Sequence, residues 1–264
     1  ESRHTLVLID GVRVGSATSG LTSLQDLPLE QIERVEIVRG PRSSLYGADA
    51  IGGVIQVFTR RGKGNAGVRG RARIGAGSHG LREASAGLDL RGARGGVGLD
   101  LGHQSTDGID SCRGIGAPWY AGCGMDNPDP DRDGYRNNNV SLRADFAASE
   151  AWQFEAQGLR ARGHNFFDAD PAWGLPDNSK VLQQVVGGSV RYRPSQALGL
   201  RLTVGRNIDA SDNHLGATYM DRFETRRDSA SLQGDFVVAD GQVLTAGFDW
   251  LRDGGGVDGP FASF

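Results

Sequence analysis

The residues best suited to chemistry in this sequence are aspartates near the middle of the chain. Asp129-Pro130-Asp131-Arg132-Asp133-Gly134 places carboxylates at alternate positions before a glycine. Hard oxygen ligands at this spacing resemble the opening of a calcium-binding loop, although the acidic residue that would close an EF-hand is replaced by Val140. The segment is a candidate calcium site, with a solvated acidic loop as the alternative. Its candidate ligands are Asp126, Asp129, Asp131 and Asp133.

Catalytic chemistry finds no support in the sequence, and we expect no enzyme. The five histidines are spread over different segments, and neither a G-x-S-x-G nor an H-E-x-x-H motif occurs. Gly75–Gly80 has the form G-x-G-x-x-G, with Asp100 twenty residues beyond it. A dinucleotide site would need a helix after these glycines, whereas Ala86–Gly92 alternates as a strand. The glycines therefore predict a hairpin turn.

Cys112 and Cys123 lie in a segment rich in Gly, Pro and Asp. Their spacing does not fit a C-x-x-C motif, and two thiols without a nearby histidine make a poor zinc site. A disulfide between Cys112 and Cys123 in an oxidising compartment is the favoured arrangement, with two free thiols as the alternative.

Composition excludes several classes of protein. The net charge is -3 and the pI about 6.0, so no basic excess indicates nucleic acid as a partner. Glycine supplies 41 of the 264 residues without a G-X-Y period, which suits an all-β chain with many turns and excludes collagen. No run of 18 apolar residues occurs, but a membrane-spanning strand needs only about 9–11 residues, with alternate side chains facing lipid.

Alternating segments follow a basic, glycine-rich stretch at 62–67. In Val68–Ala76, the apolar side chains would face lipid and Arg69, Arg71 and Arg73 would face water. Further strands are predicted at 81–92, 96–106, 136–148, 151–164, 181–193, 198–210, 221–238 and 242–252. Short connections alternate with the long polar segments 107–135, 165–180 and 211–220. Outer-membrane barrels alternate short periplasmic turns with long extracellular loops in the same way.

The stretch Ile32–Arg61 organises the first part of the chain. Val35 and Ile37 alternate with polar residues, Gly40-Pro41 ends this strand, and Val54–Phe58 is a nearly continuous apolar run. The sequence ERVEIVRGPRSSLYGADAIGGVIQVFTRR resembles the C-terminal half of the plug domain of TonB-dependent outer-membrane receptors. The segment from Val7 to Val12 resembles the strand and Asp-Gly turn of the same domain.

The resemblance implies an all-β membrane barrel with a small α+β plug domain in its lumen. Receptor barrels of this kind have roughly 22 strands. Residues 1–61 would form the C-terminal part of the plug, 62–67 a linker, and 68–264 the first nine or so barrel strands. The chain would then be truncated, and the segment that contacts TonB would precede Glu1.

The resemblance also implies a function. The protein would be a monomeric receptor, surrounded by outer-membrane lipid of a Gram-negative cell, that uses TonB to import a scarce nutrient. The plug's apical loop and the aromatic residues of a long loop would bind this substrate, namely Val14, Gly15, Ser16, Ala17, Thr18, Ser19, Trp119 and Tyr120.

The Asp-rich loop resembles the vitamin B12 (cobalamin) receptor branch, whose members use calcium to order their early extracellular loops. Asp131-Arg132-Asp133-Gly134-Tyr135 is the matching stretch, so cobalamin or another corrinoid is the expected substrate and Ca²⁺ an ordering ion. A siderophore or haem receptor would share the same plug and barrel. A structural or adhesive barrel and a soluble dinucleotide enzyme are the alternatives from other classes.

Overall fold

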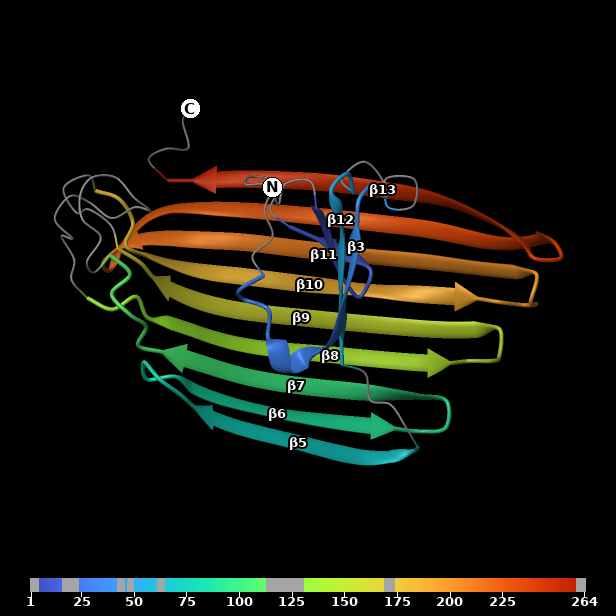
Figure 1. The fold of residues 1–264 in the computed structure, drawn as a ribbon, viewed down its shortest axis with the longest axis horizontal. Helices are drawn as coiled ribbons and strands as arrows, with labels where there is room; N and C mark the ends of the chain where they lie inside the picture. The colour runs from blue at the N-terminus through green and yellow to red at the C-terminus, as the bar shows by residue number, and fades with distance from the viewer. Residues whose placement is uncertain are drawn as a thin grey trace.

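A computed structural model of the chain describes residues 5–15, 24–41, 46, 50–60, 65–112, 131–168 and 174–259. These residues form two β-sheets, which we call the small sheet and the large sheet (Figure 1). No helix in this part of the chain is long and apolar enough to cross a membrane.

The small sheet has the strand order β2-β1-β4-β3. Its strands are β1 (Thr5–Ile9), β2 (Val12–Val14), β3 (Ile32–Arg39) and β4 (Gly53–Thr59), and only β1 and β4 pair in parallel. β1 and β4 lie in the middle of the sheet, where most side chains on both faces are buried. This burial on both faces explains why their sequences are nearly continuous apolar runs. The 3₁₀ helix η2 (Leu29–Gln31) follows Pro28 and ends where β3 begins.

The large sheet has nine strands in the described residues, each antiparallel to the next along the chain. They are β5 (Gly67–Ala76), β6 (Arg82–Arg91), β7 (Gly95–Thr106), β8 (Tyr135–Ala147), β9 (Trp152–Phe166), β10 (Asn178–Tyr192), β11 (Leu198–Leu215), β12 (Thr218–Ala239) and β13 (Gln242–Asp258). Short turns after β6, β8, β10 and β12 lie at one end, on the right of Figure 1. The all-β barrel architecture predicted from the sequence is confirmed, as an open section of the barrel wall.

The connection at 211–220 differs from the expectation of a long polar loop. β11 and β12 continue through this segment and are joined by a tight turn at Gly216-Ala217, where Gly216 adopts a φ of 57°. The polar side chains that suggested a loop bond to each other across the two strands. For example, Arg222 Nη1 lies 2.8 Å from Asp212 Oδ1. The pairing of the backbone therefore extends well beyond the apolar part of the strands.

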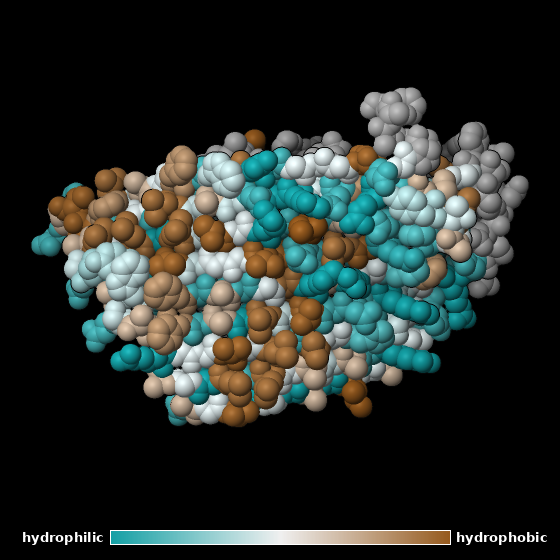
Figure 2. Space-filling model, turned by 180° about the vertical axis from the view of Figure 1, so that it is seen from behind, coloured by the Kyte–Doolittle hydropathy of each residue, from teal (hydrophilic) through white to brown (hydrophobic). Residues whose placement is uncertain are grey.

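Side chains of the large sheet alternate between a polar inner face and an apolar outer face. On β5, Val68 is 70% exposed and Ile74 is 88% exposed on the outer face. Arg71 points inward, where it pairs with Asp89 and lies 2.7 Å from Asp100. Figure 2 shows the outer face, with hydrophobic side chains gathered in its centre and toward the short turns. A polar lumen face and an apolar lipid face are the pattern of a membrane barrel.

The small sheet packs against the inner face of the large sheet through one apolar contact. Val12 on β2 is fully buried, and it shares a core with Leu159 on β9 and Val185 on β10. A Cβ added to Gly187 or Gly205 would lie 2.5 Å from Val12. These two glycines are paired across β10 and β11, so together they form a hollow that Val12 fills.

Polar contacts surround this apolar contact. Gln31 Nε2 donates to Asn139 Oδ1 at 2.6 Å, and Gln157 Nε2 donates to the carbonyl of Asp10 at 3.2 Å. The segment before η2 is held by Asp26, whose Oδ1 accepts a hydrogen bond from the Tyr135 hydroxyl at 3.0 Å. The small sheet is thus held by a close-packed apolar contact, by several separate hydrogen bonds and by an ion pair of Arg13 with Asp249 at 3.7 Å.

The glycine hollow generates a first prediction. Gly205→Ala places a methyl group against Val12, and such overpacking costs typically about 1–3 kcal/mol. We expect faster hydrogen exchange of the β2 amides, because β2 must move away from the wall. Gly70→Ala is the matched control, since a Cβ there meets nothing within 4 Å. Protection should return in the double variant Gly205→Ala with Val12→Ala, and unchanged protection in Gly205→Ala alone would contradict the contact.

Asp26 generates a second prediction, on pH. Its side chain is 1% exposed, and burial raises the pKa of this carboxyl although the Tyr135 hydrogen bond opposes the shift. The folded protein therefore binds more protons than the unfolded chain between about pH 3.9 and the raised pKa, so stability increases as the pH falls through that window.

We expect the small sheet to be better protected at about pH 4, inside that window, than at about pH 7, measured by hydrogen exchange of the β1 and β4 amides after correction for intrinsic rates. Asp26→Asn should flatten this dependence, because an amide does not titrate. An Asp26→Asn variant with the same pH dependence as the parent protein would show that another group is responsible.

Candidate functional site

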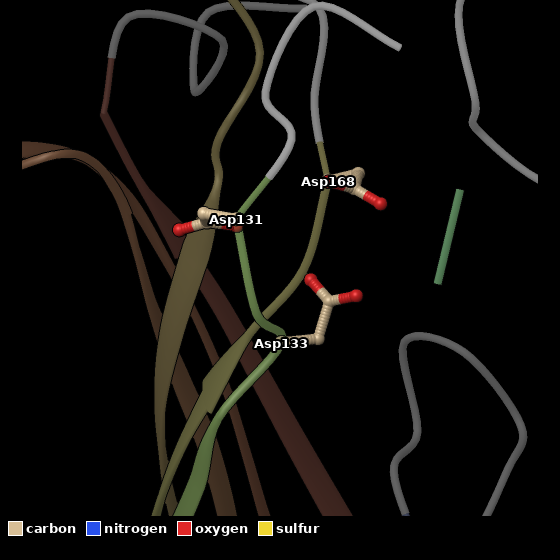
Figure 3. Close-up of side chains that lie close together, drawn as sticks. All are labelled: Asp131, Asp133 and Asp168. Carbon is tan, nitrogen blue, oxygen red and sulfur yellow. The ribbon is translucent and has the colours of Figure 1, made fainter. Parts of the chain in front are cut away.

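Three carboxylates meet at the long-loop end of the large sheet. Asp131 and Asp133 directly precede β8, and Asp168 follows β9. β8 and β9 are antiparallel neighbours with Tyr135 opposite Asn165, so the start of one strand lies beside the end of the other. One oxygen from each of the three carboxylates lies within 4.8 Å of the others (Figure 3). We call this group the acidic cluster.

Hydrogen bonds from Ser111 orient two members of the acidic cluster. The Ser111 amide donates to Asp133 Oδ2 at 2.8 Å, and its hydroxyl contacts both Asp133 Oδ2 and, at 3.1 Å, Asp168 Oδ2. The other oxygens, Oδ1 of Asp133 and Oδ1 of Asp168, are buried and have no hydrogen-bond partner in the described residues. Buried oxygens without partners are costly, and a hard cation would satisfy them.

The electrostatics of the acidic cluster also favour a cation. Burial raises the pKa of Asp168, the negative charge of Asp133 raises it further, and the hydrogen bond from Ser111 opposes the shift. Like charges at this separation repel, and a divalent ion bound between them would reverse the interaction. The residues present therefore fit calcium, which takes carboxylate oxygens in flexible arrangements.

Two of the three carboxylates in the acidic cluster were candidate ligands in the sequence. Asp131 and Asp133 lie together as the D-x-D spacing suggests, whereas Asp126 and Asp129 lie outside the described residues. Asp168 was not among the candidate ligands. Its position follows from the pairing of β8 with β9, so the signal that could have found it is the acidic residue just beyond the end of the neighbouring strand.

The expected substrate-binding residues are only partly described. Val14 is 2% exposed and belongs to the core with Val12. The carbonyl of Gly15 accepts a hydrogen bond from Asn207 Nδ2 on β11 at 3.2 Å, which fixes the start of the apical segment against the wall. Outside the described residues lie Ser16, Ala17, Thr18, Ser19, Trp119 and Tyr120, and their contact with substrate stays a prediction.

Cys112 follows Ser111 and is 2% exposed. Cys123 lies outside the described residues, so the disulfide between them stays a prediction. Such a bridge would tie the segment after β7 beside the acidic cluster, because Ser111 contacts two of its carboxylates.

Comparisons with known proteins agree with this fold. Residues 1–54 match the family model of the TonB-dependent Receptor Plug Domain. The chain is 32% identical over 253 residues to the vitamin B12 transporter BtuB of Photobacterium profundum. This match covers 96% of the present chain and 39% of that protein. BtuB of Vibrio cholerae is 31% identical over 67% of this chain, which corresponds to 27% of that protein. The chain thus spans well under half the length of these curated relatives.

Solved structures share the architecture at lower identity. The ferric enterobactin receptor of Pseudomonas aeruginosa superposes with a TM-score of 0.73 at 18% identity, over 95% of this chain and 42% of that one. The copper transporter OprC superposes with a TM-score of 0.75 at 16% identity, over 96% of this chain and 39% of that one. At this identity the likeness concerns the fold alone. With the plug match and the curated relatives, it shows that the chain belongs to the TonB-dependent outer-membrane receptors, near their vitamin B12 receptor branch.

Proposed function

We propose that the receptor of which this chain is part imports vitamin B12 or another corrinoid across the outer membrane, driven by TonB. The observation that carries the proposal is the 32% identity to a vitamin B12 transporter over 96% of this chain. The solved siderophore and copper receptors are at most 19% identical, so they support the fold without favouring their own ligands. In this family the small sheet corresponds to the plug and the large sheet to the barrel wall.

The contacts between plug and wall suit a seal that can be opened. Around the single hollow that Val12 fills, the polar contacts are separate, such as Gln31 to Asn139 or Gln157 to Asp10, and the net contribution of one such hydrogen bond is about 0.5–1.5 kcal/mol. Water can replace them one at a time as the plug is displaced. In the proposed cycle the outer loops and plug apex hold the substrate, and TonB pulls on the plug until the passage opens.

Calcium has a defined place in this proposal. Asp131, Asp133 and Asp168 would hold the ion and so connect the segment that enters β8 with the segment that leaves β9. Ser111 would be oriented in the same cluster, which brings in the segment after β7. Ordering these three segments before substrate arrives removes part of the entropic cost of binding.

The substrate proposal predicts calcium-dependent binding of cyanocobalamin to the intact receptor, because the ion pre-orders the loops. Isothermal titration with and without calcium should show binding that is at least about tenfold tighter with the ion, for about 1.4 kcal/mol of ordering energy. Ferric siderophores and haem are titrated in parallel. If one of them binds and cyanocobalamin does not in either condition, the corrinoid assignment is wrong while the family assignment stands.

The acidic cluster predicts a separate result that does not depend on the substrate. Asp133→Asn with Asp168→Asn removes two of the three charges, and we expect calcium affinity to fall by about tenfold or more. Asp240→Asn is the matched control, because Asp240 is exposed in the short turn at the opposite end of the sheet. Calcium titration calorimetry in the absence of corrinoid measures the effect. Equal calcium affinity in the double variant and the control would rule out this cluster as the site.

A further inference from the structure

The outer face of the large sheet carries four cations close together on β8, β9 and β10. They are Arg136, Arg160, Arg162 and Lys180, and we call them the cationic patch. Their outward orientation follows from the alternation of the strands, because the neighbouring residues Asn137, Leu159, Ala161 and Ser179 are buried on the inner face.

Strand register makes the cationic patch continuous. Arg136 is paired with His164, which is in turn paired with Lys180. Arg160 and Arg162 lie on β9 between these strands, on the same face and nearer the apolar centre of the wall. Neighbouring strands are about 4.8 Å apart, so the four side chains can reach a single ligand group or a row of them.

Within the described residues, the cationic patch is not balanced by carboxylates. None of the outward-facing residues in the described parts of β8, β9 and β10 is Asp or Glu. No ion pair involves these four cations within the described residues, and Nε of Arg160 is buried without a hydrogen-bond partner. The carboxylate in register with Lys180 is Asp212, which is engaged 2.8 Å from Arg222.

On the neighbouring strands β11 and β12, outward-facing arginines are paired with carboxylates. On β11 and β12, Arg206 pairs with Asp228 and Arg226 pairs with Glu224, each at 2.5 Å. Arg222 is held by Asp212 and Glu224. Among the residues that the structure describes, outward arginines at similar heights are therefore neutralised on one part of the wall and unpaired on the adjacent part, which suits an anionic partner from outside.

The height of the cationic patch suggests what this partner is. The rings of Trp152 and Tyr192 lie with their centroids 4.3 Å apart, near the short turns. Such aromatic residues mark the edge of the apolar band at that end of the barrel. Eight residues further along β9, at about 3.3 Å each and a tilt of about 45°, Arg160 lies about 19 Å above Trp152 in a band about 25 Å tall. Arg162 lies about 5 Å higher. Figure 2 shows hydrophilic side chains gathered toward this long-loop end of the outer face.

We infer that the cationic patch binds the phosphorylated headgroups of lipid in the outer leaflet. Guanidinium groups bind phosphate through paired hydrogen bonds, and each Lys or Arg near an anionic membrane surface adds to the attraction. Arg160 lies about 6 Å below the top of the apolar band, a distance that its long side chain can span, so its guanidinium can extend to the level where headgroups begin. This inference rests on the orientation of the barrel in the membrane and is independent of which nutrient is imported.

The test uses the intact receptor in a neutral detergent, titrated with lipid A and with dephosphorylated lipid A, with bound lipid counted by native mass spectrometry. The patch variant carries Arg160→Gln, Arg162→Gln and Lys180→Gln, and removal of three such charges should weaken lipid A binding about a hundred-fold. The matched control carries Arg206→Gln, Arg226→Gln and Arg227→Gln, which removes three charges that carboxylates already neutralise and leaves Asp212 engaged with Arg222. It should bind as the parent protein does.

Two further readouts keep the result decisive. Heat-modifiable gel mobility identifies a variant that has not folded. If the patch variant has not folded, the parent protein alone provides the test, because raising the salt from about 0.05 M to about 0.5 M must then weaken its binding of lipid A. Equal affinity of the parent protein for the two lipids, salt-insensitive binding, or a folded patch variant that binds like the control would each overturn the inference.

Discussion

The insertion of Val12 between Gly187 and Gly205 is the contact on which the arrangement of the two sheets depends. The glycines are paired across β10 and β11, so two missing side chains create one hollow rather than two separate gaps. With β2 seated there, Gly15 meets Asn207 and Asp10 meets Gln157. Close packing of Val12 fixes where the small sheet lies on the wall. The hydrogen bonds around it fix the orientation of the small sheet, because hydrogen bonds depend on angle.

Much of the fold could be predicted from the alternation of apolar and polar residues. Lipid on one side and a polar lumen on the other impose a strict period of two, so the predicted β8 and β9 differ from the observed strands by only one or two residues at most ends. The segment 211–220 was mispredicted because alternation stops above the apolar band, where both faces meet water, while the backbone pairing continues.

The candidate site was less accessible to sequence reasoning. Asp131 and Asp133 are close because they are close in sequence, whereas Asp168 joins them only through the pairing of Tyr135 with Asn165. The hollow for Val12 depends on how one sheet lies on the other, which no local pattern encodes. Features set by spacing along one strand were predictable, and features set by contact between distant strands were not.

The hairpin of β11 and β12 has a consequence for the outer surface of the receptor. These strands have 18 and 22 residues, about twice the 9–11 that a membrane requires, and they are paired as far as the turn at Gly216. Their outer halves therefore form a stiff ribbon that stands above the lipid rather than a loose loop. β10 and β13 remain paired with this ribbon as far as His214 and Arg222, so the wall itself, and not a separate loop, is continued outward at this point.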